Sequence, residues 1–374
     1  MESAVIPAWK NSPGNMGNRL HTICSYMAMF PPSIPNYFIR KYSEPGNIVL
    51  DPFSGRGTAP LEACVLGRLG IGNDKNPLAF VLTAAKVEVP PISEIITRIR
   101  NLSEEYKLNN DTTTLETDWK INMLFSDYTL KQLCFLREKL LWRSDSVDTF
   151  ITAMILGIMH GNANSYLSIK MPNTFSMAPN YVKNYIENHH LDRPKRDVFY
   201  SLLKKLERCY QVVKIHGKAY NEDARNLTQI ADSSVNLIVT SPPYTRVIRY
   251  GDFNWIRLWF LKNKSKEVDK ALFCSASLTK YKEFMSEIFE ETSRVLEDEG
   301  TAIFVIGDVK DKEGENSINL AQYIWEEVAK PKGFSLQGSI LEDRIDDTTK
   351  VSKIWGDTRG QATKIDRILL LKKS

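Results

Sequence analysis

The chain has 374 residues, of which 43% are hydrophobic, 25% charged and 10% aromatic, a composition typical of a globular protein with one large domain or two small ones. No apolar run approaches the roughly 18 residues that span a bilayer, and residues 1–10 lack the features of a signal peptide, so we expect a cytoplasmic protein without a membrane segment. The net charge of +4 permits a nucleic-acid partner but does not require one.

The cysteines give no sign of a disulfide framework or a zinc site, because they are widely spaced and form no CxxC pair. We expect buried or incidental thiols and no bound metal. The residues are Cys24, Cys64, Cys134, Cys209 and Cys274.

The N-terminal part alternates strands and helices. Residues 47–51 are a short apolar run that ends in an acid, which is typical of a buried parallel strand, and a glycine-rich turn follows over 52–58. The pattern then predicts a helix over 59–66, a second strand over 69–74, and another helix that begins at Pro77. This order begins a doubly wound α/β sheet.

A mostly helical insertion interrupts that pattern over residues 92–213. Apolar residues at helical spacing predict helices over 95–106, 130–141, 146–160 and 198–213. Between the last two we expect a long irregular loop, Asn162–Arg196. Residues 1–91 and 214–374 then form one Rossmann-like domain that the insertion divides.

The α/β pattern resumes after the insertion. A turn over 221–224 should follow a short strand, and a buried strand over 235–240 leads into Ser241-Pro-Pro-Tyr244. The later elements are an amphipathic helix over 280–296 closed by Gly300, a strand over 301–306, a helix over 318–328 and a closing strand over 366–372.

The glycine-rich turn and the strand-end acids suggest a ligand pocket. Gly55 and Gly57 let the backbone turn sharply and approach a ligand, although any tight turn from a strand to a helix favours glycine. Asp74 ends the next strand, where its carboxylate can accept hydrogen bonds from ribose hydroxyls, and Asp223 is placed to accept one from an adenine amino group. Because the phosphate-loop pattern GxxxxGK is missing, a cationic, ribose-bearing ligand fits better than a polyphosphate.

The proline turn at residues 241–244 has the chemistry to hold a planar amine. Its prolines fix the backbone, so the Ser241 hydroxyl and the Pro242 carbonyl can accept both hydrogens of an exocyclic base amine. Such bonds would favour a pyramidal nitrogen, which is a better nucleophile. Tyr244 would stack on a base that has been turned out of its helix. The alternative is a turn that simply ends a strand.

The pairing of Asp51-Pro-Phe-Ser-Gly-Arg-Gly-Thr58 with Ser241-Pro-Pro-Tyr244 resembles the amino-methylating DNA methyltransferases, the N4-cytosine and N6-adenine group. In that family the first motif holds the cofactor and the second holds the target amine. A serine at the first place of the second motif is similar to the N4-cytosine members. Phe30-Pro-Pro32 and the segment from Ile354 to Arg367 also look like parts of the family.

The resemblance implies S-adenosylmethionine as cofactor and methyl transfer to cytosine N4 in double-stranded DNA, with flipping of the target base. It implies an insertion that serves target recognition or forms a lid, and it allows a paired restriction endonuclease. The implied catalytic residues are Ser241, Pro242, Pro243 and Tyr244. The implied cofactor-binding residues are Phe30, Pro31, Asp51, Phe53, Ser54, Gly55, Gly57, Thr58, Asp74, Asn76, Asp223 and Ala224.

The sequence leaves other targets and functions open. The target is alternatively adenine N6 in DNA or a guanine amino group in RNA, and a non-catalytic nucleic-acid binder would keep the same fold. Methylation of carbon 5 is disfavoured, because that reaction needs a cysteine after a proline and no cysteine here follows one. In the insertion, phosphate contacts and a merely solvated face are both open for four basic residues, Lys183, Arg193, Lys195 and Arg196.

Overall fold

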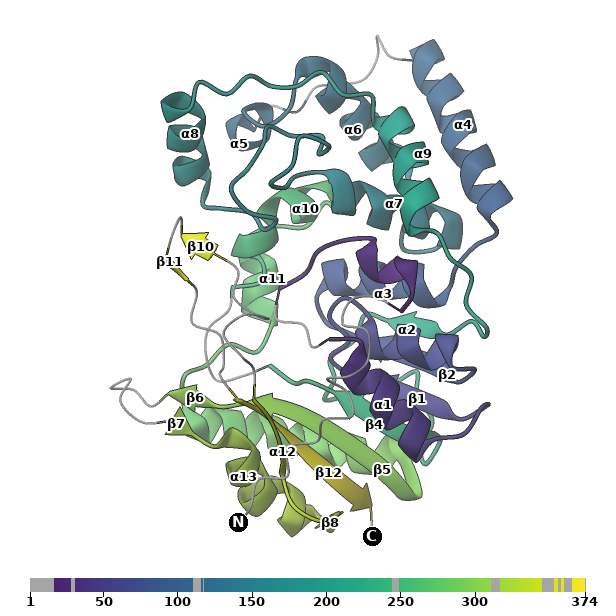
Figure 1. The fold of residues 1–374 in the computed structure, drawn as a ribbon, viewed down its shortest axis with the longest axis vertical. Coiled ribbons are helices and arrows are strands. Elements are labelled where there is room, and N and C mark those ends of the chain that lie inside the picture. The colour runs from purple at the N-terminus through teal and green to yellow at the C-terminus, as the bar shows by residue number, and fades with distance from the viewer. Residues whose placement is uncertain are drawn as a thin grey trace.

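The computed structural model describes residues 17–27, 31–109, 116, 118–243, 249–310, 317–344, 353–355, 358–359 and 365–373 (Figure 1). Phe30, Tyr244 and much of the segment from Ile354 to Arg367 lie outside the described residues. Within the described part of the chain, no helix has the length and apolarity that a membrane crossing requires.

One mixed sheet forms the base of the molecule and confirms the predicted α/β class. In spatial order its strands are β3 (Lys218–Tyr220), β2 (Leu69–Asn73), β1 (Ile48–Asp51), β4 (Val235–Thr240), β5 (Leu296–Gly307), β12 (Ile365–Lys373) and β8 (Phe334–Leu336). The strands from β3 to β5 run parallel, whereas β12 is antiparallel to β5, to β8 and to β9 (Leu341–Arg344).

The strand order places a topological switch point beside β1. The chain moves from β1 outward through β2 to β3, and then returns to β4 on the opposite side of β1. Since β1 pairs in parallel with both neighbours, the crevice outside the carboxyl ends of β1 and β4 is the expected ligand position of such a sheet.

Alternate residues of the strands face two separate layers of helices. Val49 and Leu237 pack with α1 (Ser33–Tyr42) and α2 (Thr58–Val65), and Leu50 and Ile238 pack with α12 (Leu278–Val295) and α13 (Leu320–Ile324). Successive residues of a strand point to opposite faces of the sheet, and helices cover both faces. The strands therefore appear in the sequence as continuous apolar runs.

Two predicted boundaries near the C-terminal end are wrong. Helix α12 ends at Val295 and β5 begins at Leu296, so Gly300 lies within the strand and does not close the helix. The helix predicted over 318–328 begins at Leu320 and continues as a π-helix, Trp325–Ala329, followed by a 3₁₀ turn, Lys330–Lys332. Two small ribbons complete the strands, β6 (Val309–Lys310) with β7 (Ser317–Ile318) and β10 (Lys353–Trp355) with β11 (Thr358–Arg359).

Helices fill the chain between α3 (Pro77–Val87) and β3, where the insertion is predicted (Figure 1). They are α4 (Ile92–Asn109), α5 (Trp119–Asn122), α6 (Asp127–Lys139), α7 (Ser146–Ile158), α8 (Pro179–Asn188) and α9 (Val198–Cys209). The stretch Asn162–Arg196, expected as a long irregular loop, contains helix α8, with Pro179 in its first turn, a position that suits proline.

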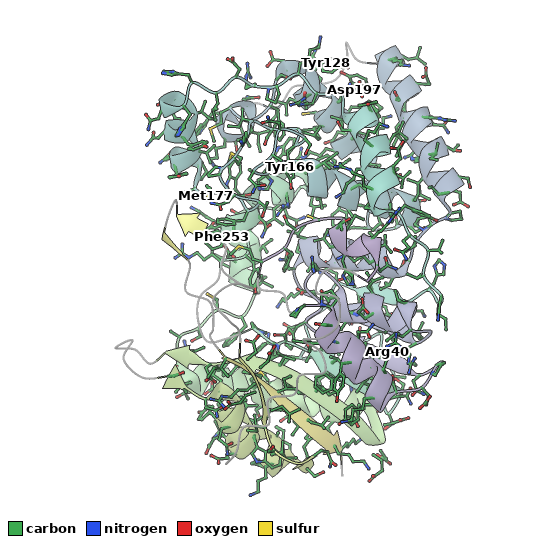
Figure 2. The ribbon with its side chains drawn as sticks, viewed as in Figure 1. Arg40, Tyr128, Tyr166, Met177, Asp197 and Phe253 are labelled. Carbon is green, nitrogen blue, oxygen red and sulfur yellow. The ribbon has the colours of Figure 1, made fainter. Side chains whose placement is uncertain are left out.

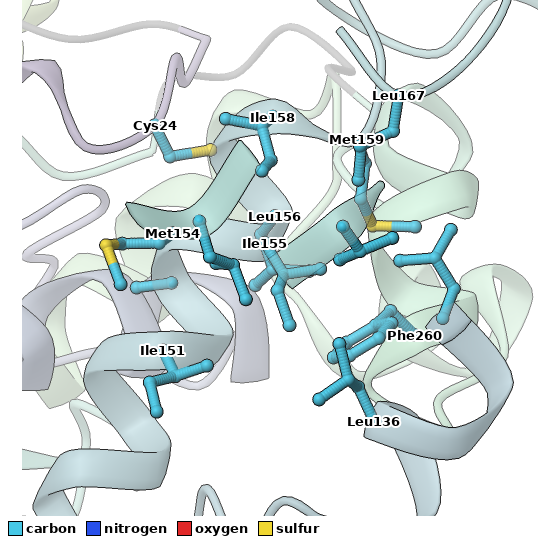
Figure 3. Packing of buried hydrophobic residues seen from close by; sticks show 14 of the residues in the cluster. Cys24, Leu136, Ile151, Met154, Ile155, Leu156, Ile158, Met159, Leu167 and Phe260 are labelled. Atoms are coloured by element: carbon cyan, nitrogen blue, oxygen red, sulfur yellow. The ribbon is translucent and has the colours of Figure 1, made fainter. Parts of the chain in front are cut away.

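After β4 the chain returns to the helices between α3 and β3 and packs against them. A 3₁₀ turn (Asp252–Asn254), α10 (Trp255–Phe260) and α11 (Ser265–Ala271) follow the proline turn. Phe260 of α10 packs with Leu136 of α6 and with Ile155 of α7 in one continuous core (Figure 3). The helices between α3 and β3, with α10 and α11, thus form one helical layer. Residues that follow the proline turn in the sequence complete it.

An N-terminal segment with a 3₁₀ turn, Arg19–Thr22, crosses α7 at Gly157. A Cβ atom added at Gly157 would lie 1.8 Å from the carbonyl oxygen of Ile23. The side chain of Cys24, the next residue, packs beside α7 (Figure 3).

The Gly157→Ala variant should lose about 3 kcal/mol of unfolding free energy, in the upper part of the range for overpacking, because a backbone atom must move. Chemical denaturation measures this loss. Gly17→Ala is the matched control, since nothing lies within 4 Å of a Cβ atom there, and it should leave stability nearly unchanged. A Gly157→Ala protein as stable as the wild type would contradict the close crossing.

Candidate active site

The carboxyl ends of β1 and β4 are joined by one buried hydrogen bond. The Thr240 hydroxyl donates to Asp51 Oδ1 over 2.6 Å, across 189 positions of sequence. Asp51 begins the glycine-rich turn and Thr240 precedes the proline turn. The two motifs singled out in the sequence therefore meet at the switch point.

Asp51 is a buried acid without a cationic partner among the described residues. Its other donor is the Phe53 backbone N–H, at 3.1 Å from Oδ1. Burial raises the pKa of Asp51 to about 7, against the opposing effect of the two hydrogen bonds. In the ligand-free protein this carboxyl group therefore holds its proton to a higher pH than an exposed aspartate does.

The glycine-rich turn is held in a fixed shape. Gly55 and Gly57 have φ values of 52° and 76°, and a Cβ atom at Gly57 would lie 2.8 Å from the Cα atom of Thr83. Ser54 Oγ lies 2.9 Å from Thr83 Oγ1, and the buried Thr58 hydroxyl accepts a long hydrogen bond of 3.4 Å from Arg56 Nε. The side chains of Ser54 and Thr58 thus bind within the protein, and their predicted cofactor contacts stay predictions.

Lys86 supports this turn from the side of α3, a contact that no pattern in the sequence indicates. Its ammonium group is fully buried and donates to the carbonyl oxygen of Arg56. Burial and the nearby Arg56 guanidinium lower the pKa of Lys86 well below its usual value.

Asp74 follows β2 and faces the glycine-rich turn. Its Oδ2 accepts from the Gly55 N–H at 2.9 Å and its Oδ1 from the Asn76 N–H at 2.8 Å, while the residue stays half-buried. Burial raises the pKa of Asp74 to about 6 and outweighs the two hydrogen bonds, which lower it. Asn76 caps α3 and donates its amide hydrogen to the Tyr26 hydroxyl at 3.1 Å, which adds a residue that sequence reasoning missed.

Asp223 follows β3 as predicted, but its carboxylate is already bound. Lys75 Nζ lies 2.7 Å from Oδ2, and Arg225 donates to both oxygens. These cations hold the pKa of Asp223 well below its usual range. Its four acceptor positions are filled, so the predicted bond to an adenine amino group requires that Lys75 move away.

Two further predicted residues line the same edge of the sheet. The half-buried Phe53 ring lies 6.0 Å from the Phe284 ring of α12. Ala224 is buried in the layer of α12 and α13. Pro31 is exposed at the start of α1, away from any contact described for the glycine-rich turn.

The described part of the proline turn leaves β4 directly. Pro242 is buried, whereas Ser241 and Pro243 are half-buried. The buried Thr240, tied to Asp51, fixes the direction in which this turn starts.

Of the four basic residues for which the sequence leaves both phosphate contacts and a solvated face open, two bind the protein itself. Arg193 Nη1 donates to the carbonyl oxygens of Asn122 and Phe125, at 3.0 and 3.2 Å. Arg196 Nη2 donates to the carbonyl oxygen of Asn164 at 2.6 Å. These arginines therefore hold the segment between α8 and α9 against the rest of the protein. They are not merely solvated side chains.

The other two basic residues are differently placed. Lys195 Nζ lies 4.8 Å from the centre of the Tyr128 ring, whose hydroxyl donates to Asp197. Figure 2 shows Tyr128 and Asp197 at the end of the molecule farthest from the sheet. Lys183 is exposed on α8, beside a hollow that Trp119 also lines.

The histidines and cysteines of the described residues form no metal-ligating cluster. His160 is fully buried, and burial lowers its pKa well below the usual value. Across the described residues, no three acidic, histidine or cysteine side chains cluster as metal ligands do. Four of the cysteines are buried and Cys274 is exposed.

Strand order and site together define a class of protein. A parallel sheet with an antiparallel strand inserted between β5 and β8, and with acids and a glycine-rich turn at its switch point, is the Rossmann-like methyltransferase fold.

Residues 6–84 match the family described as DNA methylase, which groups N6- and N4-methylating enzymes. The chain is 27% identical over 93 residues to the type II methyltransferase M.MjaII of Methanocaldococcus jannaschii, a match over 24% of this chain and 18% of that protein. It is 23% identical over 319 residues to M.BsoBI of Geobacillus stearothermophilus, over 74% of this chain and 61% of that protein. These matches make the chain similar to the amino-methylating DNA methyltransferases. It spans less than two thirds of the length of both relatives.

Solved structures give more distant likenesses. TrmN from Thermus thermophilus is 12% identical with a TM-score of 0.38, over 95% of this chain and 52% of that one. A SAM-dependent methyltransferase from Methanosarcina mazei is 11% identical with a TM-score of 0.37, over 90% of this chain and 96% of that one.

Titration of Asp51 should make the ligand-free protein less stable as pH rises. Its pKa of about 7 in the folded state exceeds the ordinary value of 3.8, so between these values the folded state holds a proton that the unfolded state releases. The contribution of Asp51 to stability therefore falls as pH rises from about 4 to about 7, and is constant above that window. Denaturation of the wild type and of Asp51→Asn at pH 5 and pH 7.5 checks the sign. The wild type should lose stability relative to the variant at the higher pH, and a difference that does not change with pH would refute the assignment.

Proposed function

We propose that this protein methylates the exocyclic N4 of cytosine in DNA, with S-adenosylmethionine as methyl donor. The observation that carries the proposal is the pair of carboxylates at the switch point. Asp51 and Asp74 accept hydrogen bonds only from neutral donors, and no lysine, arginine or histidine of the described chain forms an ion pair with either. Uncompensated negative charge in a buried site favours a cationic ligand.

S-adenosylmethionine is the cofactor of this family, and the residues fit it. It supplies a methyl group made electrophilic by a positive sulfonium. Asp74 would hold the ribose hydroxyls, the Gly55–Gly57 turn would lie under the amino-acid part, and Asp51 would lie near its ammonium group. Phe53 would wall the pocket, and Asn76 keeps Asp74 in place through its N–H group.

The proline turn would hold the target amine. The Ser241 hydroxyl and the Pro242 carbonyl accept its two hydrogens in this proposal, and Pro243 stiffens the turn. Tyr244 would stack on the flipped base. Positioning of the amine toward the electrophilic methyl would then provide most of the rate enhancement, and no covalent intermediate with the protein is needed.

Serine at the first place of the turn favours cytosine N4 as the target. Adenine N6 in DNA is the alternative, because the turn accepts any planar amine. A guanine amino group in RNA is a more distant alternative. A non-catalytic binder is disfavoured, because Asp51, Asp74 and Ser241 are present at the carboxyl ends of β1, β2 and β4, and Gly55 is present in the turn after β1.

Double-stranded DNA is the proposed partner, and the helices between α3 and β3 would contact it as a target-recognition region or lid. Lys183, exposed on α8, is better placed for a phosphate than Arg193 and Arg196, which bind carbonyl groups of the protein. Action on cellular DNA implies a cytoplasmic location and allows a paired restriction endonuclease.

Removal of the Asp74 carboxylate should weaken cofactor binding. Asp74→Ala deletes a charged acceptor, so affinity for S-adenosylmethionine should fall by about 1.5–3 kcal/mol in calorimetry. Asp298→Ala is the matched control, because it removes the same charge from an exposed position near the amino end of β5, at the opposite edge of the sheet. Equal affinities in the two variants would remove Asp74 from the site.

Replacement of the serine should impair the chemical step. Ser241→Ala should lower the methylation rate about 10–1000-fold, the effect of one positioned hydrogen bond in a dry site, and leave cofactor affinity nearly intact. Single-turnover transfer of a labelled methyl group to DNA measures the rate, and nucleoside mass spectrometry of the product should show N4-methylcytosine and no 5-methylcytosine. N6-methyladenine would keep the mechanism and overturn the choice of base, whereas full activity of Ser241→Ala would exclude the serine.

A further inference from the structure

Two tyrosines from distant parts of the chain stack beside the glycine-rich turn. Tyr26 precedes α1, and Tyr250 follows the proline turn. Their ring centres are 5.9 Å apart and their planes differ by 19°. Neither residue belongs to the two motifs that carry the family resemblance.

The pair lies directly against residues assigned to the cofactor. The Tyr26 hydroxyl accepts from the Asn76 amide at 3.1 Å, and Tyr26 Cε1 would lie 3.4 Å from a Cβ atom added at Gly55. Asp74 lies close enough that its negative charge, after burial, raises the pKa of both phenols. Both tyrosines therefore stay uncharged, with an anion at their side.

Hydrogen bonds fix the backbone on both sides of this stack. Arg257 is almost fully buried and donates to Ser25 Oγ at 3.0 Å and to Asn254 Oδ1 at 2.8 Å. The Asn254 amide in turn donates to the carbonyl oxygen of Tyr250 at 2.9 Å. One arginine thus holds the residue before Tyr26 and, through Asn254, the backbone of Tyr250.

The segment after Tyr250 is anchored as well. The carboxylate of Asp269 accepts from the N–H groups of Gly251 and Asp252, at 2.7 and 3.0 Å. The carbonyl oxygen of Phe253 accepts from the Ser176 N–H at 2.8 Å, and Figure 2 shows Phe253 near Met177, between the helical layer and the sheet. A wall built in this way is rigid before any ligand binds, which reduces the entropy cost of recognition.

The chemistry of this wall suits a cation. Aromatic faces attract positive charge through the ring quadrupole, and the Asp74 carboxylate adds a full negative charge beside them. We propose that Tyr26 and Tyr250, together with Asp74, recognise the sulfonium of S-adenosylmethionine and so favour the cofactor over its product, S-adenosylhomocysteine, whose sulfur carries no charge. This inference rests on the proposed function, since it requires the cofactor at Gly55 and Asp74.

Discrimination between the charged and the neutral ligand makes the inference testable without activity measurements. Calorimetry on the full chain gives Kd for S-adenosylmethionine and for S-adenosylhomocysteine, and the wild type should bind the former more tightly. The Kd ratio of product to cofactor should fall about 2- to 30-fold in Tyr26→Leu and in Tyr250→Leu, the range of a cation–π contribution. Tyr26→Phe and Tyr250→Phe keep the rings and should keep the ratio.

Tyr200→Leu is the matched control, because Tyr200 is 62% exposed on α9, and this variant should leave both Kd values unchanged. Folded Leu variants that lose affinity equally for both ligands, or for neither, would overturn charge recognition by the pair. A wild type that binds both ligands equally would overturn it without any substitution. A wild type that binds neither ligand would overturn the proposed function itself, which is a separate result.

Discussion

The site depends on the parallel pairing of β1 with β2 on one side and with β4 on the other. Parallel strands end at the same edge, so Asp51, Asp74 and the proline turn converge although β4 is far from β1 in sequence. Glycines in β2 make this pairing compatible with close helices. A Cβ atom at Gly70 would lie 2.1 Å from the Pro60 carbonyl oxygen, and one at Gly72 would lie 2.5 Å from Thr83 Cγ2. Side chains at these positions would push α2 and α3 away and widen the crevice.

Charge compensation differs along this edge of the sheet. In the middle, Asp51 and Asp74 have no cationic partner among the residues that the structure describes, and their pKa values are raised. Asp223 at the β3 end is paired with Lys75 and Arg225, and its pKa is lowered. Three acids with similar positions on parallel strands thus have different chemical roles. The first two would be open to a cationic ligand in the proposed function. The third binds Arg225, which Glu287 also binds, and so stabilises the structure at the β3 end of the sheet.

Local sequence patterns revealed the parts of this molecule that are built locally. The strand-end acids, the glycine-rich turn and the helix starting at Pro77 are each encoded within a few residues, and the structure has them where the patterns indicate. Tyr26 and Tyr250 could not be found in this way, because their contact joins residues 224 positions apart and leaves no periodic signal. Likewise the ion pair of Asp223 with Lys75 depends on how the ends of β2 and β3 meet. Helix α8 was missed because its short, polar sequence has only Val182 buried.

The buried Arg257 has a consequence for the modularity of the protein. Its guanidinium binds the carbonyl oxygens of Leu156 and Thr174 in the helical layer, and also Ser25 and Asn254. Excision of the helices between α3 and β3 would leave this cation without two of its acceptors and would expose the apolar residues of α10. The helices between α3 and β3 therefore cannot be replaced without changes in α10. A lineage that acquires a new version of these helices must also rewrite α10, so the segment after the proline turn and the inserted helices are constrained to evolve together.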